Sequence, residues 1–390
     1  MKRYLVLFVL IASSLFGQTA ADVAERNALV SKVLGEERAF WVRVPDGYAR
    51  SGETRYPVLY LTDGDFQMFH MVATVSFLER EGKIPQMIVV GVGNTDRTRD
   101  LTPSRASMLQ LDGTRREFPT SGGGPRFLEF FETELIPWVE SRYRTQPFRI
   151  FAGHSLGGLF AVEAIASRPD LFRGVIVASP SLQWDEDHAV RDMRALFDTR
   201  KELPVTLHVT AGREADALVS SVRRFERLAS KKGPKGFAAT FSYHEDEDHG
   251  SIVLRTHYDG LRKIFAGFAP PTDENGLFEL EWAALKKHYA GVSKRLGYEV
   301  LVPERMTNML GYQKLAQNRL DEAIAIFKEN LAHWPHSPNV YDSLGEAYER
   351  SGRRDLAREQ YAMAVKRSAG AGDPNEAVYK ANLERVSRAE

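Results

Sequence analysis

The segment G-H-S-L-G at residues 153–157 constrains the fold of this 390-residue chain more than any other stretch. An apolar run of strand character, residues 149–152, precedes it, and residues 158–164 follow with the spacing of a helix. Glycines flank the serine because larger side chains would clash in a tight turn from a strand into a helix. Such a turn lifts the serine hydroxyl clear of the sheet. The motif therefore predicts that Ser155 is a nucleophile, which requires a base, an acid and an oxyanion hole elsewhere in the chain.

Short strand-like runs alternate with amphipathic stretches from about residue 38 to residue 268. The β-branched and aromatic runs predict strands at 39–44, 57–61, 87–92, 149–151, 174–178, 205–209 and 238–243. The amphipathic stretches predict helices at 66–80, 124–143, 156–168, 189–198, 218–230 and 252–268. This alternation indicates an α/β fold, a mostly parallel sheet with helices on both faces. Functional side chains in such sheets lie beyond the carboxyl ends of the strands, so the loops after the strands are the ones to search.

The composition excludes several classes of function. Lys plus Arg and Asp plus Glu both number 52, so the chain has no basic surplus for binding nucleic acid. It contains no cysteine, which excludes disulfides, thiolate metal sites and a cysteine nucleophile. The acidic stretch 244–249, with a histidine at each end, lacks the spacing of a metal-binding helix and is interpreted as a solvated loop. We therefore expect neither a cofactor nor a catalytic metal.

The first 21 residues have the pattern of a signal peptide. Lys2 and Arg3 precede an apolar run at 4–16 that is too short to span a bilayer, and small residues suited to cleavage follow at 17–21. We expect residues 1–21 to be removed and the mature protein to lie outside the cytoplasm, in the periplasm. No cysteine follows the apolar run and no later segment is long and apolar enough to cross a membrane, so no stable membrane anchor is expected.

A second, all-helical domain is expected beyond a linker at 269–276, where proline, glycine and polar residues cluster. Residues recur there at an offset of 34 positions, pairing Leu310-Gly311 with Leu344-Gly345, Ala323 with Ala357 and Phe327 with Tyr361. This period and these residue types are the signature of tetratricopeptide repeats. We predict domains at 27–268 and 277–390, with capping helices at 277–297 and 376–386 on either side of two repeats. The helical domain is expected to bind a peptide or protein, or to pack onto the first domain.

The loops after the later strands supply a base and an acid for Ser155. In α/β-hydrolases the chain order is serine, acid, histidine. Of the five histidines that follow Ser155 in the first domain, His249 is the one in a loop between the last strand and the next helix. The acid should follow the strand at 205–209, where Glu214 and Asp216 both qualify. Asp216 is also suited to capping the next helix, which favours Glu214 as the residue that orients His249.

Two backbone N–H groups are expected to form the oxyanion hole. One belongs to Leu156, the residue after the nucleophile. The other should come from the loop after an early strand, and the sequence Leu-Thr-Asp-Gly-Asp at 61–65 ends a strand and opens a helix. We expect the N–H of Asp65 to be this second donor.

Four segments resemble an esterase family that includes ferric-siderophore (enterobactin) esterases, feruloyl esterases, S-formylglutathione hydrolases and mycolyltransferases. They are Pro57–Gly64, Gly153–Phe160, Ser179–Leu182 and Asp248–Ser251, and the siderophore-esterase-like members also show patterns like 97–103 and 134–137. The resemblance covers residues 38–268 and implies an α/β-hydrolase fold and a small-molecule ester as substrate. It places the acid at Glu214. The tetratricopeptide tail is an attachment seen in some bacterial members.

The substrate does not follow from the resemblance. The segment 94–120 is interpreted as a long rim over the site, in which Arg97, Arg99 and Arg105 would suit an anionic substrate such as a ferric catecholate complex or would be ordinary surface arginines. Trp184 and Phe69 are candidate apolar walls. The expected function is a secreted serine hydrolase that cleaves carboxylic esters through an acyl-enzyme. An acyltransferase with the same triad, and an inert tetratricopeptide scaffold, are the alternatives.

Overall fold

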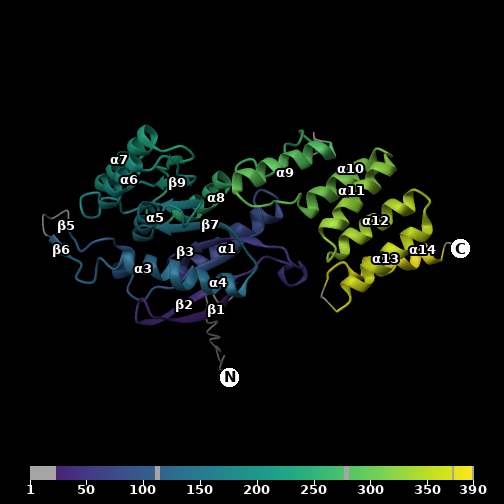
Figure 1. Cartoon of the computed structure of the whole chain (residues 1–390), viewed down its shortest axis with the longest axis horizontal. Coiled ribbons are helices and arrows are strands. Elements are labelled where there is room, and N and C mark those ends of the chain that lie inside the picture. The colour runs from purple at the N-terminus through teal and green to yellow at the C-terminus, as the bar shows by residue number, and fades with distance from the viewer. Residues whose placement is uncertain (1–22, 110–114, 276–280, 371–372, 389–390) are drawn as a thin grey trace, which may run out of the picture.

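The computed structural model describes residues 23–109, 115–275, 281–370 and 373–388, so the predicted signal segment lies outside the described residues. Its centre is an eight-stranded sheet in the order β1-β2-β4-β3-β7-β8-β9-β10 (Figure 1). The strands are β1 Glu25–Ser31, β2 Glu36–Arg43, β3 Tyr56–Leu61, β4 Ile88–Val92, β7 Thr145–His154, β8 Gly174–Ala178, β9 Thr206–Ala211 and β10 Ala238–Tyr243. β2 runs antiparallel to β1 and β4, and the neighbouring strands from β4 to β10 are parallel. The predicted mostly parallel sheet is confirmed.

Helices cover both faces of this sheet, as predicted. They are α1 Gly64–Arg80, α2 Arg97–Leu101, α3 Gly124–Phe130, α4 Ile136–Arg142, α5 Leu156–Ser167, α6 His188–Thr199, α7 Asp216–Lys232 and α8 Ile252–Ile264. Side chains alternate along each strand, so β3 sends Val58 and Tyr60 into a core shared with α3 to α7. It sends Leu59 and Leu61 into a second core shared with α1 and α8. Burial on both faces explains why the central strands read as continuous apolar runs.

Three local features differ from the prediction. The edge strand β1 is missed because residues 25–27 are polar and largely exposed, and its apolar run at 28–30 is only three residues long. The helix expected at 124–143 contains a wide π-turn, η3 Phe131–Leu135, just before Pro137, whose missing N–H cannot continue the regular ladder. The segment 94–120 contains α2 and a small antiparallel pair, β5 Ser107–Leu109 and β6 Arg115–Glu117.

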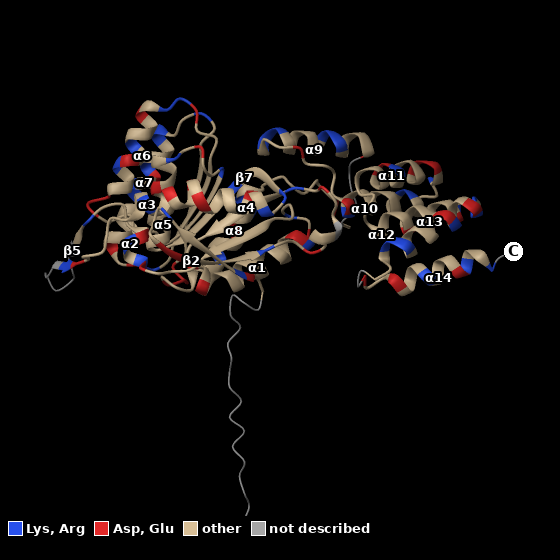
Figure 2. Ribbon diagram, turned by 60° about the horizontal axis from the view of Figure 1, so that its bottom comes forward, with Lys and Arg blue, Asp and Glu red and all other residues tan. Residues whose placement is uncertain are grey.

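The C-terminal part, over the residues that the structure describes, is all-helical, as expected (Figure 2). Its helices are α9 Trp282–Leu296, α10 Glu304–Ala316, α11 Leu320–His333, α12 Pro338–Arg350, α13 Arg354–Ser368 and α14 Glu376–Ser387. α12 begins 34 residues after α10, and α13 begins 34 residues after α11. A Cβ added to Gly311 would come within 2.4 Å of the Phe327 ring, so a glycine is needed where α10 crosses α11. These hairpins agree with the sequence repeat, and their assignment to the tetratricopeptide class stays a prediction.

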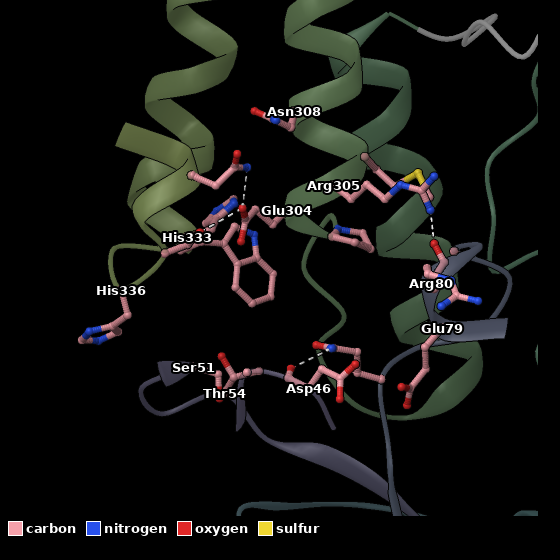
Figure 3. Close-up of a pocket in the computed structure, with 18 of the residues that line it drawn as sticks. Asp46, Ser51, Thr54, Glu79, Arg80, Glu304, Arg305, Asn308, His333 and His336 are labelled. Atoms are coloured by element: carbon pink, nitrogen blue, oxygen red, sulfur yellow. Dashed lines mark hydrogen bonds between the residues drawn. The ribbon is translucent and has the colours of Figure 1, made fainter. Parts of the chain in front are cut away.

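The helical region packs against the sheet domain, with α9 lying between α8 and the α10–α11 hairpin (Figure 1). Met306 and Leu310 of α10 join the core that also contains Phe268 and the buried face of α1. Arg305 donates a hydrogen bond to the carbonyl oxygen of Arg80 across the seam, the interface between α10 and the sheet domain (Figure 3). A cavity of about 700 Å³ lies in the seam. It opens near the amino ends of β3 and β4, at the edge of the sheet opposite the carboxyl ends where Ser155 lies.

None of the described helices is long and apolar enough to span a membrane. 

His208, on β9, makes the stability of the sheet pH-dependent. Its ring is fully buried, its Nδ1 lies 2.8 Å from the Thr240 hydroxyl, and burial lowers its pKa to about 4. Because the unfolded chain binds this proton near pH 6.5 and the folded chain does not, the free energy of unfolding should decrease as the pH falls through 6.5. The loss contributed by His208 continues down to about pH 4, at up to about 1.4 kcal/mol per pH unit.

Chemical denaturation of the parent and of His208→Asn between pH 7 and pH 4.5 measures this contribution. Asparagine keeps a polar group near the Nδ1 position, and other buried histidines contribute equally to both proteins. The difference in unfolding free energy should therefore shift in favour of the variant as the pH falls. Parallel curves over the whole range would contradict the assignment.

Candidate active site

Ser155 lies at the junction of β7 and α5, in a strained turn. Its backbone has φ 59° and ψ −115°, a conformation that L-residues rarely adopt. Three backbone hydrogen bonds hold it, one from its N–H to the Ala178 carbonyl and two to its own carbonyl from the N–H groups of Ser181 and Leu159, each 3.0 Å long. The turn therefore fixes the direction of the Ser155 side chain, which the sequence motif predicted.

The flanking glycines are required because other atoms approach both of them closely. A Cβ on Gly153 would lie 2.1 Å from the carbonyl oxygen of Gly157, and a Cβ on Gly157 would lie 2.4 Å from the Thr62 hydroxyl. Gly153→Ala should therefore destabilise the protein by about 3 kcal/mol, at the upper end of overpacking costs, because the clash is with backbone that cannot rotate away. Gly291→Ala is the matched control, since a Cβ there meets nothing within 4 Å in the middle of α9.

Thermal unfolding of both variants measures the effect. We expect Gly291→Ala to leave the midpoint unchanged or to raise it slightly, as alanine favours a helix interior over glycine. A Gly153→Ala protein with the parent's unfolding midpoint would contradict the tight turn.

His249 and Glu214 reach Ser155 from separate loops. His249 follows β10, and its Nε2 lies 3.0 Å from the Ser155 Oγ. Its Nδ1 lies 3.1 Å and 3.0 Å from the two carboxylate oxygens of Glu214, which follows β9. Glu214 accepts only, so Nδ1 carries the proton and Nε2 is free to accept the serine proton. These three residues form a relay from Ser155 through His249 to Glu214. The Glu214 side chain is buried and that of His249 is half-exposed, so the relay opens to solvent at the histidine.

The two loops are also tied to each other. The N–H of Arg213 donates to the Glu247 carbonyl over 2.7 Å, and a Cβ on Gly212 would lie 2.7 Å from the same oxygen. The other candidate acid, Asp216, is exposed at the first residue of α7. The geometry thus brings Glu214 to His249 and leaves Asp216 at the helix start, where its negative charge suits the helix dipole.

Three further residues brace the site and were not predicted from the sequence. His154 Nε2 lies 2.7 Å from the carbonyl oxygen of His249 and donates to it. Asp63 pairs with Arg97 over 2.7 Å, and Arg97 also donates to the His154 carbonyl over 3.1 Å. Asn94 donates to the carboxylates of Asp63 and Asp65. His154 and Asp63 lie within two residues of a predicted site residue, and Asn94 lies inside the predicted rim. This nearness in sequence is the only sign of their role that the sequence offered.

His154 remains neutral in this network because burial lowers its pKa, with the nearby His249 ring adding to the shift. A neutral ring that donates through Nε2 fixes the carbonyl of His249, and hence helps to position the His249 side chain. The same network reaches Asp65 through Asp63 and Asn94. Arg97 therefore connects His249 to the loop at 61–65, whose N–H groups are expected to hold the oxyanion.

The predicted oxyanion donors lie at helix starts. Leu156 is the first residue of α5 and Asp65 is the second residue of α1. Backbone N–H groups at such positions have no acceptor within the helix and are available to an anion. Their role in the reaction stays a prediction.

The predicted substrate-binding residues are largely occupied by protein contacts. Arg97 is engaged as described, and its side chain is 34% exposed. Arg99 pairs with Glu36 over 2.6 Å and with Asp100 over 2.7 Å. Trp184 is buried, packs against Phe118, and donates from its indole nitrogen to the Ser104 carbonyl. Trp184 therefore supports the rim from beneath, and substrate contact by any of the three stays a prediction.

Comparison with known proteins agrees with this geometry. A family model described as "Putative esterase" matches residues 31–249. The ferri-bacillibactin esterase BesA of Bacillus subtilis is 31% identical over 219 residues, which cover 51% of this chain and 75% of BesA. A siderophore enterobactin esterase of Emericella nidulans is 27% identical over 244 residues, covering 50% of this chain and 77% of that protein.

A solved structure extends the likeness. The IroE-like serine hydrolase from Shewanella oneidensis superposes with a TM-score of 0.70 at 28% identity, covering 79% of this chain and 99% of that one. The fold is thus that of an α/β-hydrolase, with a mostly parallel sheet and a C-terminal helical region. The chain belongs to the esterase family whose model it matches, and it is an esterase with siderophore-esterase-like relatives.

Proposed function

We propose that this protein is a secreted serine esterase that cleaves siderophore esters, or closely related natural-product esters, through an acyl-enzyme. The observation that carries the proposal is the relay from Ser155 Oγ to His249 Nε2, and from His249 Nδ1 to Glu214, with every step between 3.0 and 3.1 Å. A serine with a base in hydrogen-bond reach and a buried acid behind that base is the arrangement that nucleophilic acyl transfer needs.

Each residue of the relay has one task. Ser155 Oγ attacks the ester carbonyl while His249 Nε2 takes its proton and then gives it to the leaving alcohol. Glu214 holds the imidazole tautomer and stabilises the imidazolium that forms. The N–H groups of Leu156 and Asp65 hold the oxyanion. Water, activated by the same histidine, then releases the acid and restores Ser155.

The substrate class rests on the relatives and on the charge of the rim. One of the two relatives is described as a ferri-bacillibactin esterase and the other as a siderophore enterobactin esterase. Two exposed cations lie in segments expected near the site, since Arg213 immediately precedes Glu214 and Arg105 lies in the predicted rim at 94–120. Ferric catecholate complexes are anionic, so cations at the rim would attract them to the site. The signal-peptide pattern of residues 1–21 supports a periplasmic location, where imported siderophore complexes would meet the enzyme.

An ester panel tests the proposal. Ferric and iron-free trilactone siderophores, feruloyl and acetyl sugars, and short p-nitrophenyl esters are incubated with the full chain and with Ser155→Ala, and the products are separated by chromatography. We expect trilactones to give the highest kcat/KM and Ser155→Ala to give no product. Intact trilactones beside a cleaved feruloyl sugar would overturn the substrate class. A panel with no hydrolysis at all would overturn the esterase mechanism.

A further inference from the structure

A buried carboxylate on α5 lacks a hydrogen-bond partner for one of its oxygens. Glu163 lies two turns beyond Ser155, roughly 12 Å along the helix axis, and its side chain is only 7% exposed. Its Oε1 accepts a hydrogen bond from the Ser167 hydroxyl over 2.8 Å, while its Oε2 is buried without any partner among the described residues. A buried, half-satisfied carboxylate is costly unless something positive meets it.

Two further side chains of the types that can bind metals lie close to this carboxylate, on α6. His188 and Asp192 are one helical turn apart, and one donor atom from each lies within 4.8 Å of a Glu163 oxygen and of the other. No lysine or arginine in the described residues forms an ion pair with Glu163 or Asp192. The cluster thus gathers negative charge with only a histidine beside it.

The spacing of these donors fits a small transition-metal ion. His188 Nε2 and Asp192 Oδ2 are 3.4 Å apart. Two ligands bound tetrahedrally at zinc distances of about 2.0–2.1 Å are separated by about 3.3 Å, so this pair already has the required spacing. A mixed set of one imidazole and two carboxylates suits Zn²⁺, whereas Mg²⁺ and Ca²⁺ prefer oxygen ligands alone.

The surroundings orient the histidine as a metal ligand needs. His188 Nδ1 faces Asp185 Oδ2 at 3.4 Å, while Nε2 is the ring nitrogen on the side of Asp192. A carboxylate beside the outer nitrogen of a histidine is the usual surrounding of a metal ligand. Asp185 in turn accepts a hydrogen bond from the Ser104 hydroxyl over 2.6 Å. Residues 185–187 all have positive φ, at 49°, 55° and 61°, although none is a glycine. This strained turn sets His188 at the start of α6, facing α5.

We propose that Glu163, His188 and Asp192 form a structural Zn²⁺ site that ties α6 to α5, with water as a fourth ligand. The ion would compensate the buried Glu163 carboxylate and hold the strained turn that carries Trp184 and contacts the rim through Ser104. It does not touch the reacting atoms, so it is independent of the ester-cleaving relay. The inference also stands apart from the proposed substrate class.

Zn²⁺ titration by isothermal calorimetry, on full-length protein freed of metal with EDTA, tests the site. We expect one ion per chain, a dissociation constant in the micromolar range or below, and no comparable binding of Mg²⁺. Co²⁺ bound at the site should show the visible absorption of a tetrahedral complex. Glu163→Gln and His188→Ala should each weaken Zn²⁺ binding by at least about 10²-fold.

Glu186→Gln is the matched control, because Glu186 is an exposed carboxylate in the same turn and offers no donor atom to the cluster. Its Zn²⁺ affinity should equal that of the parent. Glu163→Gln keeps the shape of the side chain and an acceptor for Ser167, so it decides the question even if His188→Ala folds poorly. Absence of binding at millimolar Zn²⁺, or parental affinity in Glu163→Gln, would overturn the site. Both results are independent of ester hydrolysis.

Discussion

Ser155→Ala should lower kcat for p-nitrophenyl acetate by about 10⁴- to 10⁶-fold and leave the thermal unfolding midpoint unchanged. The rate falls because the alanine removes the oxygen that lies 3.0 Å from His249 Nε2, and no attacking atom replaces it. The stability is expected to stay the same because, within the described part of the chain, the only other hydrogen bond of this hydroxyl is one of 3.3 Å to the Ser181 hydroxyl. Steady-state kinetics and a thermal melt on the same preparation measure both effects.

Two controls separate the nucleophile from its surroundings. Ser181→Ala removes the neighbouring hydroxyl and should retain most of the activity, because Ser181 has no base beside it among the described contacts. Ser155→Gly should be as inactive as Ser155→Ala but more stable by about 1 kcal/mol, since glycine relieves the strain at φ 59°. Loss of activity in Ser181→Ala with retention in Ser155→Ala would reverse the assignment of the nucleophile.

Glu214→Gln should lower kcat by about 10²- to 10⁴-fold with little change in KM. The carboxylate accepts the proton of His249 Nδ1 through both oxygens, at 3.1 Å and 3.0 Å. A glutamine amide presents N–H groups there, which favours the wrong tautomer and gives no charge to stabilise the imidazolium. The acid is buried, so solvent does not replace it.

Asp216→Asn is the matched control for this variant. Asp216 is the other acid of the same loop, two residues away, but it is exposed at the first residue of α7. Its replacement should leave kcat unchanged and cost at most about 1 kcal/mol through the helix dipole. Equal loss of activity in the two variants would show that the loop tolerates neither change, and would contradict the specific role of Glu214.

The sequence predicted those parts of the fold whose structure follows from their own residue types. The apolar runs of the parallel strands and the glycines around Ser155 carry their structure in their own residue types, and so does the 34-residue repeat of the tail. β1 and the π-turn at 131–135 were missed. The first is a polar edge strand held by its pairing with β2, and the second is a local adjustment before Pro137.

In the active site, too, local sequence predicted some residues and missed the long-range contacts. The loop order predicted Ser155 and His249 as partners, and the structure brings these two residues and Glu214 within hydrogen-bond distance. Sequence reasoning left Asp216 as an alternative because two acids in one loop differ only in which way the chain turns. His154 was treated as part of the motif, yet its contact with the His249 carbonyl joins residues 95 positions apart. The ion pair between Arg97 and Asp63 was not foreseen either, because the sequence suggested only substrate contact or a surface position for Arg97. Such long-range partners become visible only when the strand order is known.

Covalent labelling with a fluorophosphonate, followed by mass spectrometry of the intact protein and its peptides, tests the central claim most directly. The reagent needs an activated serine with a functioning base, so it reports the nucleophile without any assumption about the ester that the enzyme cleaves. We expect one adduct per folded chain, on the peptide that contains Ser155, and none in Ser155→Ala. An unlabelled folded parent protein, or an adduct on another serine, would contradict the account.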